Sequence, residues 1–159
     1  MKIKIAVLTI SDSCIAGNRD DVSGQTIIDM LPEETFEVCE KKIVADDCEK
    51  IAIVLKSFSD EQGIDVVLTT GGTGLGPRDV TPEATASVCE RMAPGFSEIQ
   101  RVEGFKKTPK AILSRGVTGV RKNTLIVNLP GSPKAVRECL EIIVDVIPHA
   151  VKMMRGGGH

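Results

Sequence analysis

The chain has 159 residues, a net charge of −2 and a hydrophobic content of 42%, proportions that are typical of one ordinary globular domain. Lys and Arg are spread along the chain and the only aromatic residues are four Phe, so neither a polycationic nucleic-acid surface nor a base-stacking platform is expected. The five cysteines form no Cys-x-x-Cys pair, and no segment approaches the roughly 18 apolar residues of a membrane helix. We therefore expect a reduced, soluble, cytoplasmic protein that binds neither nucleic acid nor membrane.

The first part of the chain predicts two strands, each followed by a helix. Residues 3–10 are a short run rich in Ile, Val and Leu, which is typical of a strand buried in a parallel sheet. A polar loop then leads to a helix that we expect Ser23 to cap. Residues 35–44 alternate like a second strand, and a helix with a 3.6-residue apolar period follows, capped by Asp46 or Asp47.

The middle of the chain continues this alternation. A third strand is predicted at 65–70 and runs into a glycine-rich loop, after which Thr81 is expected to cap a helix. Another helix follows Pro94. Two more strands are predicted at 111–117 and 124–129.

Ser132 is expected to cap the last helix, which Pro148 would kink. Strands alternating with helices predict the α/β class, as a three-layer α/β/α sandwich around a largely parallel sheet. We expect one domain over residues 1–155, followed by a flexible tail at 156–159.

The most informative segment is residues 68–85, LTTGGTGLGPRDVTPEAT. Glycines let backbone N–H groups approach a ligand, and the helix that follows offers unpaired amides and the positive end of its dipole. The spacing Gly-x-Gly-x-Gly matches neither the Walker loop nor the dinucleotide fingerprint. From the residues alone, the loop predicts a site for phosphate or another anion beside a carboxylate.

Three predicted strand ends run into turns rich in glycine or serine, at residues 9–13, 69–76 and 129–132. Ligands of open α/β sheets gather beyond the carboxyl ends of the strands. We therefore expect the three turns to form one site, although tight turns alone would also account for the glycines.

Charged side chains beside these turns are candidate ligand contacts. Asp79, together with Asp46 or Asp47, could hold Mg²⁺, or could cap the helices that they precede. Arg115 could grip a phosphate as a fork, whereas a surface role is at least as expected for Arg121. No Ser-His-Asp set and no Cys-His pair is suggested, so nucleophilic hydrolysis has no support.

Several motifs resemble the MoaB/Mog family of molybdenum cofactor biosynthesis proteins. They are residues 68–85, residues 111–119 (AILSRGVTG), residues 124–136 (TLIVNLPGSPKAV) and the opening LTISDS at 8–13. The resemblance covers essentially the whole chain in the same order. It implies a compact three-layer α/β fold, molybdopterin as ligand, and a homotrimer or a dimer of trimers. For the Mog branch it implies that molybdopterin and MgATP give adenylylated molybdopterin and pyrophosphate.

The resemblance also implies the roles of individual residues. The family's two acidic residues, catalytic and Mg²⁺-binding, fall on Asp79 and Asp46, although many members read Pro-Asp-Glu where this chain has Ala45-Asp46-Asp47. The choice between Asp46 and Asp47 therefore stays open. The substrate-binding positions that the motifs imply are Ser11, Asp12, Ser13, Gly71, Gly72, Thr73, Gly74, Ser114, Arg115, Pro130, Gly131 and Ser132.

Two other functions compete with adenylyl transfer. One is a MoaB-type paralogue that binds the pterin and transfers nothing, and the other is an interaction domain whose glycine loops serve assembly. The motifs Arg-Asp-Val-Thr-Pro and Leu-Pro-Gly-Ser-Pro resemble the Mog branch more closely, so the enzyme is favoured.

Overall fold

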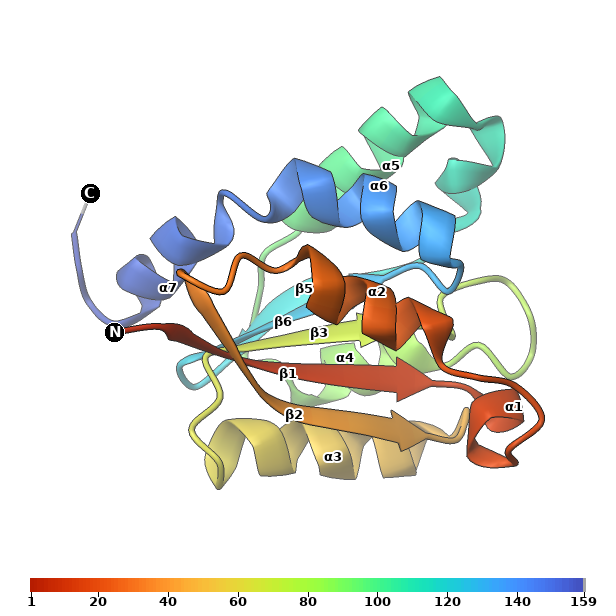
Figure 1. The fold of residues 1–159 in the computed structure, drawn as a ribbon, viewed down its shortest axis with the longest axis horizontal. Coiled ribbons are helices and arrows are strands. Elements are labelled where there is room, and N and C mark those ends of the chain that lie inside the picture. The colour runs from red at the N-terminus through yellow and green to blue at the C-terminus, as the bar shows by residue number, and fades with distance from the viewer. Residues whose placement is uncertain (159) are drawn as a thin grey trace.

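The computed structural model describes residues 1–158, and a six-stranded sheet forms its middle layer (Figure 1). The strands lie in the order β2-β1-β3-β6-β5-β4. Their bounds are β1 Ile3–Ile10, β2 Phe36–Val44, β3 Val66–Thr70, β4 Arg91–Met92, β5 Thr118–Arg121 and β6 Thr124–Leu129. The helices are α1 Asp12–Ile15, α2 Val22–Met30, α3 Cys48–Asp60, α4 Thr81–Val88, α5 Gly95–Lys107, the 3₁₀ helix η1 Pro109–Leu113, α6 Pro133–Ile143 and α7 Ile147–Met154.

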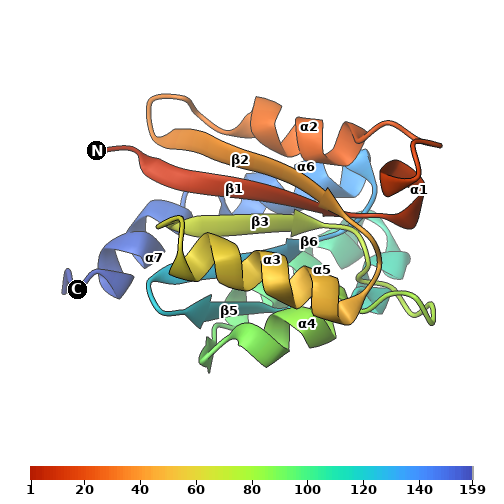
Figure 2. The ribbon, with the colours of Figure 1, turned by 90° about the horizontal axis from the view of Figure 1, so that it is seen from below.

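Helices cover both faces of this sheet, as Figures 1 and 2 show. On one face α2, α6 and α7 pack on a core that includes Ile27 and Leu140, and on the other α3 and α4 pack on a core that includes Leu55 and Phe58. All four of these side chains are fully buried, and each such burial stabilises the fold by about 1.5–3 kcal/mol. The predicted three-layer α/β/α architecture is confirmed.

The strands that carry the predicted turns run in the same direction. Strand β1 pairs in parallel with β2 and β3, and β3 pairs in parallel with β6, whereas β5 is antiparallel to both β6 and β4. All residues of β3 and β6 are buried, as expected for strands covered on both faces. Because parallel strands end at the same edge of a sheet, the segments that follow β1, β3 and β6 leave it side by side.

The strand predicted at 111–117 is wrong. This segment begins inside the 3₁₀ helix η1, which ends at Leu113, and the strand begins only at Thr118. Pro109 has the φ angle and the missing N–H that suit a first helical turn, and Ile112 and Leu113 are 59% and 49% exposed instead of facing the core. An apolar run of three residues was thus mistaken for a strand, and the two-residue strand β4 carried too short a pattern to predict.

The last helix is also two helices, not one kinked helix. Helix α6 ends at Ile143, and α7 begins at Ile147 with Pro148 in its first turn, where proline costs no hydrogen bond. The domain limit at 155 and the flexible tail stay predictions, and His159 lies outside the described residues. Within residues 1–158, no helix is long and apolar enough to cross a membrane.

Asn128 on β6 joins the sheet to the segments around it. Its amide nitrogen donates to the hydroxyls of Thr69 and Thr85, at 3.0 Å each. Its amide oxygen accepts from the backbone N–H of Val117 at 3.1 Å. The side chain is only 2% exposed, so each partner would lack water if the amide were removed.

We expect Asn128→Ala to lower the free energy of unfolding by at least about 2 kcal/mol, because each buried polar group left unsatisfied costs about 1–3 kcal/mol. Urea unfolding with an unchanged m-value measures this. Asn123→Ala, in the exposed turn between β5 and β6, is the control and should change stability by about 0.5 kcal/mol or less. Equal stability of the two variants would contradict the role given to Asn128.

Candidate functional site

A cleft of about 470 Å³ opens beyond the carboxyl ends of β1, β3 and β6. The strand order predicts such a position for a ligand site. Residues from all three predicted turns, and from the segment after β2, line the cleft. They include Ser11, Asp12, Ser13, Asp46, Gly71, Gly72, Asp79, Gly131 and Ser132. The turns therefore surround one space, and the role of each residue toward a ligand stays a prediction.

The turn after β6 is held from inside the protein. The Ser23 hydroxyl donates to the carbonyl oxygen of Gly131 at 2.6 Å. The Thr70 hydroxyl, at the end of β3, donates to the carbonyl oxygen of Pro130 at 2.7 Å. Both carbonyls of this turn consequently point into the protein.

Two hydroxyls that were predicted to cap helices hold these turns instead. Asp21 caps α2 in place of Ser23, because its carboxylate accepts the backbone N–H three residues further on, at 2.9 Å. Helix α4 follows Val80 without a side-chain cap, and the Thr81 hydroxyl donates to the carbonyl oxygen of Gly71 at 2.9 Å. Both cap predictions are wrong, because each hydroxyl donates to a loop carbonyl and accepts no amide of its own helix.

The glycine loop is held in the same way. The backbone N–H of Thr81 donates to the carbonyl of Gly72 at 3.1 Å. The backbone N–H of Arg115 donates to the carbonyl of Thr73 at 2.8 Å. The Arg115 side chain donates through Nε to the carbonyl of Gly74, also at 2.8 Å.

Inward carbonyls leave the backbone N–H groups on the other side. In a planar trans peptide the C=O and the following N–H point in opposite directions, so the N–H groups of residues 72–75 and 131–132 turn away from the protein. They donate to no acceptor among the described residues. Successive outward N–H groups of this kind form a concave site for an anion.

Glycine is required at two points of this cradle. Gly71 and Gly72 have φ angles of 98° and 66°, which other residues adopt only with strain. A Cβ on Gly71 would lie 2.3 Å from the carbonyl oxygen of Ile10, and one on Gly72 would lie 3.2 Å from the Asp46 carboxylate. The loop therefore packs its backbone directly against β1 and beside Asp46.

The structure separates the roles of Asp46 and Asp47. Asp47 caps α3, since its carboxylate accepts the backbone N–H of Lys50 at 2.9 Å. Asp46 lines the cleft and exchanges two hydrogen bonds with Asp12: Asp12 N–H to Asp46 Oδ2 is 2.9 Å, and Asp46 N–H to Asp12 Oδ1 is 3.0 Å. Asp46 is thus the acidic residue that could contact a ligand.

Three carboxylates give this part of the cleft a negative field. Burial raises the pKa of Asp46, and the charges of Asp12 and Asp79 raise it further, against the hydrogen bond from the Asp12 N–H. The N–H of Asp46 and then the Arg78 guanidinium hold the pKa of Asp12 below its usual value. A cation between Asp46 and Asp79 would relieve this repulsion.

Residues 6–149 match the family described as a probable molybdopterin binding domain. The chain belongs to this family. It is 46% identical over 156 residues to the molybdopterin adenylyltransferase of Helicobacter pylori (strain ATCC 700392 / 26695), a match that covers 97% of this chain and 89% of that protein.

Solved structures of this family have the same fold. The molybdopterin biosynthesis enzyme MoaB from Thermus thermophilus is 47% identical, with a TM-score of 0.92 and 97% of both chains covered. The tungsten cofactor synthesizing protein MoaB from Pyrococcus furiosus is 34% identical, with a TM-score of 0.87, 97% of this chain and 98% of that one covered.

Within this molybdopterin-binding fold, Arg115 holds the glycine loop instead of facing the cleft. Besides its bond to Gly74, the guanidinium donates to the carbonyl of Asp79 at 2.6 Å and forms an ion pair with Glu83. The same guanidinium holds the pKa of Glu83 below its usual value. The structure does not support phosphate binding by the Arg115 guanidinium, because its N–H groups already donate to the glycine loop and to Glu83 of α4. Arg121 pairs with Asp60 instead.

Four other residues predicted to bind substrate do not line the cleft: Thr73, Gly74, Ser114 and Pro130. Thr73 is buried, and Gly74 gives room to a carboxylate, since a Cβ there would lie 2.9 Å from Asp79 Oδ2. Ser114 and Pro130 line a different pocket. Arg78, for which the sequence predicts no role beyond its place beside Asp79, bridges the cleft loops by donating from Nε to Asp12 Oδ2 at 3.0 Å.

We expect Arg115→Lys to loosen the glycine loop, because one ammonium cannot reproduce the three divergent contacts of the guanidinium. Hydrogen–deuterium exchange of the Gly76 and Thr81 amides, which donate to Asp79 Oδ2 and to the carbonyl of Gly72, should become at least about tenfold faster, which corresponds to about 1.4 kcal/mol of lost local stability. Arg121→Lys is the control: it removes a guanidinium that pairs with Asp60, far from the loop, and it should leave that exchange unchanged. Equal protection in both variants would contradict the holding role.

Proposed function

We propose that this protein is a molybdopterin adenylyltransferase, which transfers the adenylyl group of ATP to the terminal phosphate of molybdopterin and releases pyrophosphate. The observation that carries the proposal is the row of outward N–H groups from two loops beside Asp46 and Asp79. A relative of 46% identity is named for this activity. Both substrates are phosphates, so one anion cradle next to carboxylates suits the reaction.

In this reaction a phosphate oxygen of molybdopterin attacks the α-phosphorus of ATP. A new P–O–P bond forms, the bond between the α-phosphorus and the bridging oxygen breaks, and that oxygen leaves with pyrophosphate. The N–H groups of residues 72–75 and 131–132 would bind and orient the two anionic groups, which is the main contribution that a protein can make to such a transfer. Their positions are fixed before substrate arrives, because the loop carbonyls are already bonded.

The residues of the cleft fit Mg²⁺, which we propose as the metal. Mg²⁺ usually takes one or two carboxylates together with substrate phosphates and water. Asp46 and Asp79 supply that number of carboxylates, and among the described residues no group of three or more His, Cys, Asp or Glu could hold a metal alone. When bound, the ion would neutralise the triphosphate. Asp46 and Asp79 would hold it, and Gly76 N–H orients Asp79 by donating to its Oδ2 at 2.9 Å.

A pterin-binding paralogue without transfer activity is less favoured, because several relatives that match most of this chain are named for the transferase. An interaction domain is less favoured still, since the loops enclose a cleft lined by carboxylates. Pyrophosphate release from purified molybdopterin and MgATP tests the proposal. A rate of pyrophosphate release equal to the rate without protein would contradict the proposal.

We expect Asp79→Asn to keep the fold and pterin binding, and to lower the rate of pyrophosphate release by about 10²-fold or more, because a neutral amide attracts Mg²⁺ far less. The thermal unfolding temperature reports the fold, and equilibrium titration reports binding. Asp47→Asn is the matched control, since asparagine also caps helices well, and it should retain activity. A fully active Asp79→Asn variant would contradict the role of Asp79.

We also propose that the protein assembles as a homotrimer or a dimer of trimers and acts in the cytoplasm. An apolar face on α5 and η1 supports the assembly. Ile99, Val102 and Phe105 recur every three residues on one side of α5, and they are 38%, 55% and 50% exposed. Ile112 and Leu113 of η1, the element that directly follows α5, are also exposed, and Figure 1 shows both elements projecting beyond α6. Contiguous exposed apolar surface of this kind marks interaction sites.

We expect Val102→Asp to convert the assembly to monomers, because the substitution places a charge in the centre of the apolar face. Size-exclusion chromatography with light scattering measures the mass. Ile53→Asp is the control: Ile53 is 59% exposed on α3, on the other face of the sheet. A monomeric wild type, or a trimer that survives Val102→Asp, would contradict this interface.

A further inference from the structure

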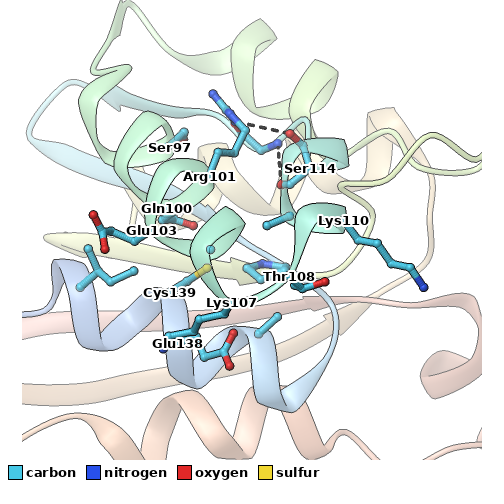
Figure 3. Close-up of a pocket in the computed structure, with 16 residues that line it drawn as sticks. Ser97, Gln100, Arg101, Glu103, Lys107, Thr108, Lys110, Ser114, Glu138 and Cys139 are labelled. Carbon is cyan, nitrogen blue, oxygen red and sulfur yellow. Dashed lines mark hydrogen bonds between the residues drawn. The ribbon is translucent and has the colours of Figure 1, made fainter.

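A second pocket, separate from the cleft, lies between α5, η1 and α6 (Figure 3). Its volume is about 220 Å³. The walls are mostly small or apolar and include Gly104, Ala111, Ala135, Cys139 and Ile142. Burial raises the pKa of the Cys139 thiol to about 11, so this side chain is an uncharged wall at neutral pH.

One polar group in this pocket lacks a partner. Gln100 is only 7% exposed, and its amide nitrogen is buried without a hydrogen bond in the described residues. Figure 3 shows Gln100 among the side chains that line the pocket. An unsatisfied buried amide destabilises the protein, and a ligand that offers an acceptor atom would remove that cost.

The charges around the pocket largely offset one another. Glu103 and Glu138 offset Lys107 and Lys110 at its edge. The guanidinium of Arg101 is engaged, since its Nη1 donates to the carbonyl of Gly116 at 2.9 Å. A neutral group with hydrogen-bonding atoms is therefore the better match.

The pocket adjoins the phosphate cradle through the backbone. Pro130 lines the pocket, and the next residue, Gly131, lines the cleft. Ser114 also lines the pocket, and it directly precedes Arg115, which holds the glycine loop. A ligand with phosphate in the cleft could thus place another part of itself here.

We propose that this pocket binds the planar, fused-ring nitrogen heterocycle of a substrate and that Gln100 is a specificity-determining residue. The inference rests on the proposed function, in which adenine and pterin are both such rings attached to phosphates. A whole small-molecule ligand usually occupies about 300–1,000 Å³, so a pocket of 220 Å³ suits one ring system. The Gln100 amide reads the edge of the ring, and Ala135, Cys139 and Ile142 contact its faces.

The test uses ligands that carry a ring and no phosphate. Adenosine and 6-hydroxymethylpterin are titrated separately into the purified protein by calorimetry, and the ring that binds identifies its substrate. Gln100→Leu should weaken that binding by about tenfold, the value of one buried hydrogen bond. Ala135→Leu should weaken it at least as much by filling the pocket. Gln62→Leu, at an exposed position after α3, is the matched control and should bind as wild type does.

The outcomes separate this proposal from the proposed function. If both pocket variants fold and bind adenosine and 6-hydroxymethylpterin as wild type does, or if neither compound binds wild type, the pocket assignment is wrong, whatever the pyrophosphate assay gives. If the wild type releases no pyrophosphate but one of the two compounds binds and Gln100→Leu weakens its binding, the proposed adenylyl transfer is wrong and the pocket assignment is supported. Thermal unfolding of each variant verifies that it is folded.

Discussion

Hydrogen bonds that tether carbonyl oxygens set the shape of the cleft loops in this protein. Ser23, Thr70, Thr81 and Arg115 each donate to a carbonyl of the two cleft loops, and the peptide plane then fixes the direction of the neighbouring N–H. An anion cradle needs donors that do not reorganise when charge arrives. The rigid sheet behind the loops supplies the anchoring positions, because β1, β3 and β6 end together.

The same arrangement explains why the loop is rich in glycine. Gly71 and Gly72 have left-handed φ angles and pack against β1 and Asp46. Gly74 and Gly76 make room for the Asp79 carboxylate, since a Cβ on either would approach its Oδ2 within 2.9 Å. Gly71 and Gly72 therefore allow the course of the backbone, and Gly74 and Gly76 leave space for the Asp79 side chain. The loop backbone and the Asp79 carboxylate can then lie close together.

The fold class and the common position of the three turns followed from the sequence. Apolar runs predict the strands, turn residues mark the strand ends, and parallel strands bring those ends to the same edge of the sheet. The choice between Asp46 and Asp47 did not follow, since both could cap a helix and only the fold shows which one Asp12 contacts. The roles of Ser23 and Thr81 depended on carbonyls 108 and 10 residues away. The contacts of Arg115 did not follow from the sequence either, because its sequence context does not show which carbonyls and carboxylates its guanidinium reaches.

The strands at the two borders of the sheet have a consequence for the behaviour of the protein in concentrated solution. Strand β4 has only two residues, which is too short to template a strand from another molecule. Strand β2, at the opposite border, carries charged residues at Glu37, Glu40, Lys41 and Lys42. Short or charged border strands are how natural proteins avoid edge-to-edge aggregation. Contacts between copies are thereby directed to helical surfaces, and ribbon-like polymers of the sheet are disfavoured.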